Sequence, residues 1–213
     1  MQIIKLVILL LFTNVISCNS FDYKKQWEDW YALGGGSGPG SQGFMAQYKA
    51  DVINNFIKQH TIDFVVEFGC GDGVNLQLMN YNKYLGFDIS KSSISRCISM
   101  FSNDSTKSFM LYTPFCFVNK NIKADLVVCL DVLYHVIDEN DFEKLIKDIF
   151  SFDAKYVILY TTVEEKQCDI DEMLFRNPMP FLRRFKNYTI EVVKNSHEIM
   201  SAADFIFLTK VTA

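Results

Sequence analysis

Glycine is scarce in this chain of 213 residues, and its distribution is uneven. Of the ten glycines, six lie between Gly34 and Gly43 and three lie between Gly69 and Gly73. The tenth is Gly86, and no glycine occurs from Phe87 to the C-terminus. Glycine that served general loop flexibility would be scattered along the chain. The two clusters therefore indicate places where the backbone approaches something closely.

The chain also lacks an excess of basic residues and any Cys-x-x-Cys pair. Its 21 lysines and arginines are outnumbered by 25 aspartates and glutamates, which gives a net charge of −4. Proteins that wrap a nucleic-acid backbone present a basic face, so no nucleic-acid partner is expected. The six cysteines have no zinc-like spacing with the three histidines. We therefore expect no metal site and interpret the cysteines as reduced residues of the core.

Residues 1–20 differ in composition from the rest. One lysine, Lys5, precedes an uninterrupted apolar run from Leu6 to Phe12, and small or branched residues follow up to Cys18. This order predicts a signal peptide or signal-anchor-like segment, and with it a secretory or membrane-tethered location. The run Val-Ile-Ser-Cys also resembles a bacterial lipobox, with Cys18 as the lipidated residue. A buried N-terminal element, or a start codon that the cell does not use, is the alternative, and the location is then cytoplasmic.

Strand and helix patterns alternate through the remaining chain. An aromatic, charged stretch at 21–31 predicts a helical leader that runs into the Gly/Ser loop 34–43, and the domain proper is expected over 44–213. Helices are predicted at 44–60, from Val74, at 90–102 and at 138–150. Strands are predicted at 62–68, 83–87, 108–112, 124–130 and 156–160, followed by a closing antiparallel pair at 188–193 and 204–208. This pattern predicts an α/β fold with a doubly wound, mainly parallel seven-stranded sheet and an antiparallel C-terminal strand pair.

The second glycine cluster follows the first of these strands. The chain reads Glu67-Phe-Gly69-Cys70-Gly71-Asp-Gly73, so an acid at the end of a strand precedes a glycine turn. A dinucleotide fingerprint would place its third glycine at position 74, where the chain has valine. The second strand then ends in Gly-Phe-Asp88, and a carboxylate there can accept hydrogen bonds from a ribose diol.

At these residues the chain resembles the class I S-adenosylmethionine-dependent methyltransferases of the small-molecule type. The resemblance implies S-adenosylmethionine as cofactor and a Rossmann-like methyltransferase fold. It implies that the acid Asp88 binds the ribose hydroxyls and that the next residue, Ile89, packs on adenine. The implied cofactor-binding set is Glu67, Gly69, Cys70, Gly71, Gly73, Asp88, Ile89, Leu130 and Asp131. The family often has an acid after the third strand, where this chain has Thr113. We therefore expect adenine to be held by backbone and by Phe115 or Phe117.

The segment after the fourth predicted strand, Asp131-Val-Leu-Tyr134-His135-Val, resembles the place where cofactor and substrate meet in the family. It implies that His135 is the catalytic base and that Tyr134 shapes the acceptor pocket. Structural interpretations remain open for these residues. Glu67, Asp88 and Asp131 are also of the type that caps backbone N–H groups, and His135 can be a packed ring.

The Gly/Ser cluster has two interpretations, a flexible linker or a lid. Its sequence resembles the leader of small methyltransferases that are encoded with surface-glycan genes, where such a loop closes over the cofactor. On that interpretation Tyr31, Gly36, Ser37 and Ser41 face the cofactor or the acceptor.

Together these features predict methyl transfer to an oxygen or nitrogen atom of a small molecule or glycan. The sequence leaves two alternatives open. One is a catalytically inactive binding protein of the secretory pathway with a methyltransferase-like fold. The other is a nicotinamide-dependent reductase, which Val74 and the closing strand pair disfavour.

Overall fold

The computed structural model of the chain describes residues 21–165, 172–197 and 201–211. The predicted signal or anchor segment 1–20, including Cys18, lies outside these residues, as does Cys168. The four cysteines within the described part are free thiols. No helix in this part of the chain is long and apolar enough to cross a membrane.

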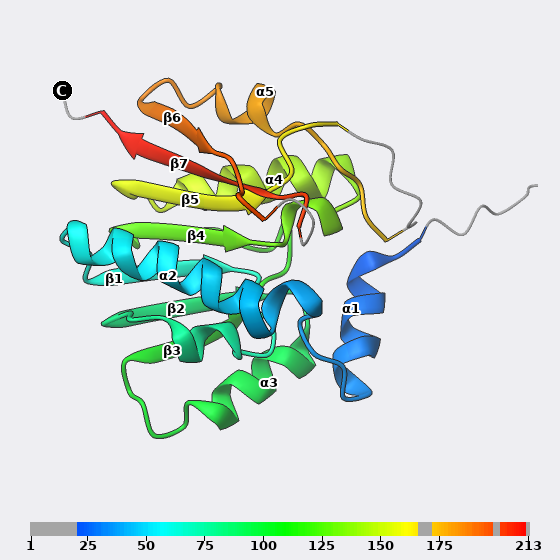
Figure 1. The fold of residues 1–213 in the computed structure, drawn as a ribbon. Helices are drawn as coiled ribbons and strands as arrows, with labels where there is room; N and C mark the ends of the chain where they lie inside the picture. The colour runs from blue at the N-terminus through cyan, green and yellow to red at the C-terminus, as the bar shows by residue number, and fades with distance from the viewer. Residues whose placement is uncertain (1–20, 166–171, 198–200, 212–213) are drawn as a thin grey trace, which may run out of the picture.

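A seven-stranded sheet forms the centre of the molecule (Figure 1). Its strand order is β3-β2-β1-β4-β5-β7-β6, with β7 antiparallel to both of its neighbours and the pairs among β1 to β5 parallel. The predicted fold class is therefore confirmed. The strands are β1 (Phe64–Phe68), β2 (Lys83–Asp88), β3 (Lys107–Leu111), β4 (Leu126–Leu130), β5 (Tyr156–Thr161), β6 (Tyr188–Val193) and β7 (Asp204–Lys210).

Helices cover both faces of the sheet. They are α1 (Tyr23–Ala32), α2 (Gly43–Gln59), α3 (Lys91–Met100), α4 (Glu139–Ser151) and the short α5 (Met179–Leu182). Three 3-10 turns complete the set: η1 (Pro39–Ser41), η2 (Asn75–Leu78) and η3 (Leu133–His135). The helix predicted to begin at Val74 is only the single turn η2, and β2 begins soon after it, at Lys83.

Two hydrophobic clusters pack against the sheet, one on each face. One contains residues of α2, η2 and α3, and the other contains residues of α4 and α5. Neighbouring strand residues divide between the two clusters, as the alternation of side chains along a strand requires. Val65 and Val128, for example, belong to the first cluster, whereas Val66 and Val127 belong to the second. This burial on both faces explains why the central strands read as continuous apolar runs.

Side-chain caps define where the helices start. Asp22 accepts hydrogen bonds from the backbone N–H groups of Lys24 and Lys25 and so begins α1. Ser90 caps α3 through a hydrogen bond from the N–H of Ser93, and Asp138 caps α4. Each cap satisfies N–H groups that would otherwise lack a partner in the first helical turn.

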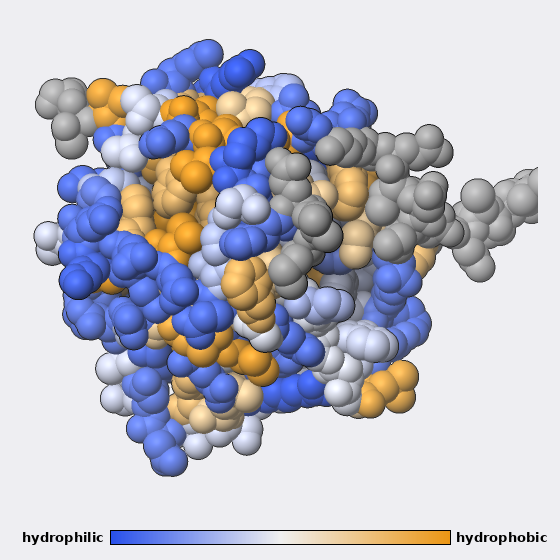
Figure 2. All heavy atoms as spheres, viewed as in Figure 1, coloured by the Kyte–Doolittle hydropathy of each residue, from blue (hydrophilic) through white to orange (hydrophobic). Residues whose placement is uncertain are grey.

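The leader helix α1 stands apart from the two helical layers. It lies at the carboxyl edge of the parallel strands (Figure 1) and contacts α3. The outer surface of α2 is mainly hydrophilic, and hydrophobic residues show next to it over the β5–β7 side of the sheet (Figure 2). Because binding sites in such sheets lie outside the carboxyl ends of the strands, α1 is placed to cover the site.

Candidate functional site

A cavity of about 420 Å³ lies at the carboxyl edge of the sheet, between α1 and the strand ends. Most of the residues predicted from the sequence to form the site line it. They are Tyr31, Gly36, Ser37, Ser41, Glu67, Gly69, Cys70, Gly71, Asp88, Ile89, Leu130, Asp131, Tyr134 and His135. The structure thus brings together residues that are up to about a hundred positions apart in the chain.

The glycine turn after β1 has the backbone conformation that its sequence suggests. Gly69 and Gly71 both have positive φ angles, of 82° and 54°. A Cβ atom on Gly69 would lie 2.1 Å from Cγ2 of Val132, and one on Gly71 would lie 2.2 Å from Oγ of Ser37. Any larger residue would displace the cavity wall or the loop after α1.

Gly73 is the one member of the predicted cofactor-binding set that does not line the cavity. Its φ angle is 80°, and a Cβ atom there would lie 3.0 Å from Sγ of Cys97 in α3. The third glycine of the turn therefore allows α3 to pack closely.

Asp88, at the end of β2, connects the glycine turn to α3. Its Oδ2 atom accepts a hydrogen bond from the N–H of Gly71 at 2.9 Å, and its Oδ1 atom accepts one from the N–H of Ser90 at 2.9 Å. Burial raises the pKa of this carboxyl group. Each carboxylate oxygen has a second lone pair, so the group can still accept hydrogen bonds from a ribose diol.

Glu67 is buried at the base of the cavity. Burial raises the pKa of its carboxyl group to about 7, although a 2.5 Å hydrogen bond from the hydroxyl of Tyr84 opposes the shift. Its structural role is therefore not the capping of the glycine turn that the sequence allowed.

Asn75 supplies a sign that the cavity takes a polar ligand. Its Oδ1 atom is buried without a hydrogen-bond partner, and the residue lines the cavity. Buried polar atoms are nearly always satisfied, so a missing partner indicates a donor that the bound ligand brings. Together with the glycine cradle and Asp88, this unsatisfied acceptor fits a cofactor that combines amino-acid and ribose groups.

The end of the cavity assigned to adenine differs from the expectation. Phe115 is exposed, and Phe117 packs against Phe68 and other residues of the core. The structure instead places Tyr112 and Pro114 at the cavity, close to Ile89 along its wall. The sequence does not show which of these residues line the cavity. Tyr112, Pro114, Phe115 and Phe117 are all apolar or aromatic and lie close together in the chain.

The Gly/Ser loop packs against the glycine turn. Ser37 donates from Oγ to Oδ1 of Asp72 at 2.8 Å, and its Oγ accepts from the N–H of Asp72 at 3.0 Å. The hydroxyl of Tyr31 lies 2.9 Å from the same Oγ atom. The loop is therefore ordered by specific contacts, which a flexible linker would not make.

Two charged residues that the sequence analysis missed hold this leader in place. Glu28 of α1 accepts hydrogen bonds from the hydroxyls of Ser90 and Ser92, each at 2.7 Å. These bonds hold the pKa of Glu28 at about 2. Arg96 of α3 donates to the carbonyl oxygen of Gly35 at 2.6 Å. The sequence gives no indication of these contacts, because charged residues such as Glu28 and Arg96 are most often exposed to solvent on a helix.

The segment after β4 forms the opposite wall. Asp131 has a left-handed backbone conformation, with φ 58°, and accepts a 2.7 Å hydrogen bond from the hydroxyl of Tyr134. It also pairs with the buried ammonium group of Lys49, another residue that the sequence analysis missed. The ring of His135 packs edge-on against Trp27, with centroids 5.0 Å apart. Burial lowers the pKa of His135, so its neutral form is favoured.

Comparisons with known proteins agree with this architecture. Residues 42–205 match the family described as methyltransferase domain. Many solved structures are also similar to the chain. The N-methyltransferase NodS from Bradyrhizobium japonicum WM9, solved with S-adenosyl-L-homocysteine, has a TM-score of 0.70 and 14% identity. This match covers 91% of the present chain and all of NodS. No curated protein sequence matches the chain significantly.

Two further solved structures share the fold. The magnesium protoporphyrin IX methyltransferase ChlM from Synechocystis PCC 6803 has a TM-score of 0.62 and 17% identity, over 89% of the present chain and 98% of ChlM. The small RNA methyltransferase HEN1 has a TM-score of 0.62 and 19% identity, over 79% of the present chain. The match spans only 25% of the HEN1 chain. The family match, the strand order and the cavity residues agree: the chain belongs to the methyltransferase domain family, and S-adenosylmethionine is the cofactor that its site fits.

Proposed function

We propose that the chain transfers a methyl group from S-adenosylmethionine to an oxygen or nitrogen atom of a small molecule, a sugar included. When bound, the cofactor supplies a methyl group that its sulfonium centre activates. The chain's own residues then have to position the acceptor, exclude water and take up a proton. The loop 34–43 serves as the lid in this proposal.

The proposal about the acceptor rests on the charge of the residues that line the cavity. Among its described lining residues are five acids, Glu67, Asp88, Asp131, Asp141 and Glu172, but no lysine or arginine. An acceptor with phosphate groups would find no lysine or arginine among the lining residues, because Lys49 and Lys24 pair with Asp131 and Asp141 without lining the cavity themselves, and this is unfavourable. This supports a neutral or amine-bearing acceptor and argues against a nucleic acid.

His135 is the candidate base. Its Nδ1 atom lies 3.5 Å from the backbone oxygen of Glu172, so a proton on Nδ1 would point toward that oxygen. The Nε2 atom is then free to accept the proton that an acceptor hydroxyl or amine gives up. Tyr134 and Trp27 pack on the ring of His135 and fix its orientation.

The test is an acceptor screen with the full chain. S-adenosylhomocysteine release and the mass of the product are measured for three groups of acceptors: neutral sugars and alcohols, amines, and phosphorylated compounds. We expect turnover in the first two groups only, and we expect His135→Gln to lower kcat about a hundredfold or more. His60→Gln is the matched control, because His60 packs on Phe56 and Tyr156, away from the cavity residues.

Three results would contradict the proposal. Preferential turnover of phosphorylated acceptors would overturn the argument from charge. An unchanged kcat in His135→Gln would show that His135 is not the catalytic base. Cofactor binding without turnover of any acceptor would favour the inactive binding protein.

A further inference from the structure

Lys49 is a lysine whose side chain is completely buried in the core of the molecule. It lies on α2 beside Ala46, Ala50 and Ile53, which are also buried. Transferring an ammonium group out of water is expensive unless a partner compensates for the lost hydration. A buried lysine is therefore expected to have a negatively charged or hydrogen-bonding partner that stabilises its ammonium group.

That partner is Asp131, on the wall of the cavity. Lys49 Nζ contacts Oδ2 of Asp131, and the hydroxyl of Tyr134 donates to Oδ1. The lid loop packs against the same carboxylate, since a Cβ atom on Gly40 would lie 3.2 Å from Oδ2. Asp131 lines the cavity, whereas Lys49 lies behind it. Of the two charged residues in this ion pair, the negatively charged one therefore lines the cavity.

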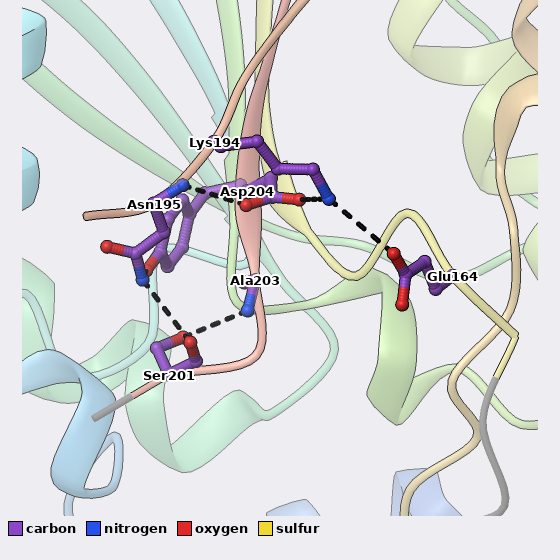
Figure 3. Close-up of polar contacts among 7 residues, drawn as sticks. Glu164, Lys194, Asn195, Ser201, Ala203 and Asp204 are labelled. Atoms are coloured by element: carbon purple, nitrogen blue, oxygen red, sulfur yellow. Dashed lines mark hydrogen bonds and ion pairs between the residues drawn. The ribbon is translucent and has the colours of Figure 1, made fainter. Parts of the chain in front are cut away.

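The buried ammonium group has further support from the sheet. It lies 5.6 Å from the ring centroid of Tyr160 on β5, which is a favourable distance for a cation–π contact. The hydroxyl of Tyr160 accepts a 2.9 Å hydrogen bond from Nδ2 of Asn195, in the β6–β7 loop. Asp204 in turn binds the N–H of Asn195 at 2.8 Å and Nζ of Lys194 at 2.9 Å (Figure 3). A continuous set of contacts therefore runs from the cavity wall to this loop.

We propose that Lys49 is a positioning residue that holds the Asp131 carboxylate in place at the cavity wall, so that the site favours the positively charged cofactor over its product. S-adenosylmethionine carries one positive charge more than S-adenosylhomocysteine, at the sulfonium centre. A carboxylate that faces the cavity stabilises that charge. The inference depends on the cofactor and not on the identity of the acceptor.

Other titratable groups also face Asp131, so the experiment has to separate their effects. They are Tyr134 and His135 on η3, Tyr160 on β5, Cys129 on β4 and Lys49 itself. The readout is therefore a ratio, the dissociation constant of S-adenosylhomocysteine divided by that of S-adenosylmethionine. Each variant is compared with the wild type at a single pH. Because Glu67 also lines the cavity and interacts with Lys49, Lys49→Met is also measured in combination with Glu67→Gln.

The decisive variant is Lys49→Met, with Lys58→Met as control on the exposed end of the same helix. Without Lys49 the Asp131 carboxyl, whose side chain is 12% exposed, loses the contact that fixes its Oδ2 atom. We expect the ratio for Lys49→Met to fall about tenfold below wild type, a usual size for coupled sites. The double variant Lys49→Met/Asp131→Asn should show no further fall below Asp131→Asn alone, and Lys58→Met should match the wild type.

A folded Lys49→Met protein with the wild-type ratio would overturn the proposal. If circular dichroism shows that this variant does not fold, Asp131→Asn replaces it, because it removes the charge with almost no change in size. A ratio about tenfold lower supports the proposal, and an unchanged ratio overturns it. A wild-type chain that binds neither compound would instead overturn the cofactor assignment.

Discussion

Ser37 and Asp72 join the leader to the glycine turn through reciprocal hydrogen bonds. Besides the two bonds of the Ser37 hydroxyl, the N–H of Ser37 donates to Oδ2 of Asp72 at 3.2 Å. The loop after α1 is thus fastened to the segment that would lie beneath the cofactor. Ligand binding and closure of this loop should therefore be coupled.

Replacing Ser37 by alanine should weaken that coupling. The change removes the hydroxyl but leaves the backbone bond, so we expect a loss of about 1 kcal/mol in closure and a several-fold faster release of S-adenosylhomocysteine. The only two tryptophans, Trp27 and Trp30, both lie on α1 and line the cavity, so stopped-flow tryptophan fluorescence can follow the release. Ser95→Ala is the control, because that hydroxyl bonds only within α3. Equal release rates for Ser37→Ala and wild type would contradict a lid role.

Glu28 should make the docking of α1 dependent on pH. Its pKa is held at about 2 in the folded chain, below the ordinary value of 4.5, mainly by the bond from Ser90. A depressed carboxyl pKa means that the contribution of Glu28 is present above about 4.5 and is lost as the pH falls toward 2. We expect Glu28→Gln to show at neutral pH the red-shifted tryptophan emission that wild type shows only in acid. Asp29→Asn, which alters an exposed pair with Lys25, should not shift the emission.

Glu67 should have the opposite pH dependence. Its folded pKa of about 7 lies above the ordinary 4.5, so the folded state holds the proton more tightly than the unfolded state. Stability from this group is therefore full below about 4.5 and declines as the pH rises through 7, by about 3 kcal/mol at most. Glu67→Gln cannot ionise. Urea unfolding should show it gaining stability relative to wild type between pH values of roughly 5 and 8. A constant difference across this range would show that Glu67 does not titrate as described.

Gly69 should tolerate no side chain. Alanine at this position combines a positive φ with a Cβ atom 2.1 Å from Val132, so we expect Gly69→Ala to lose about 3 kcal/mol or more of folding free energy. Gly34 is the matched control. Its φ is 98°, but nothing lies within 4 Å of the Cβ position, so only the backbone strain of about 1–2 kcal/mol remains. Urea denaturation of the two variants measures the difference. Similar losses would indicate that Val132 moves aside.

Much of the fold could be predicted from the sequence, because the central strands are buried on both faces and read as apolar runs. The glycine turn and Asp88 were also recognisable, since their spacing is local. Lys49 was not. Hydrophobic periodicity in α2 predicts a buried stripe of Met45, Tyr48, Val52, Phe56 and Ile57, but apart from Met45 these residues are only partly buried.

The fully buried side of α2 combines Met45 and Ile53 with two alanines and the charged Lys49. Hydrophobic periodicity cannot detect such a face, because the partner that makes a buried lysine favourable is Asp131, 82 positions away. Glu28 was missed for the same reason. The hydroxyls that it binds follow β2, and only the folded sheet brings them to α1.

The most direct test of the account is equilibrium binding of S-adenosylmethionine to wild type and to Asp88→Ala, measured by calorimetry. We expect the wild type to bind one equivalent and Asp88→Ala to bind about tenfold more weakly or worse, because bonds to a charged group are lost. Asp63→Asn, which alters an exposed pair with Lys83, should bind as the wild type does. No binding by the wild type, or full affinity in Asp88→Ala, would contradict the assignment of this cavity to the cofactor.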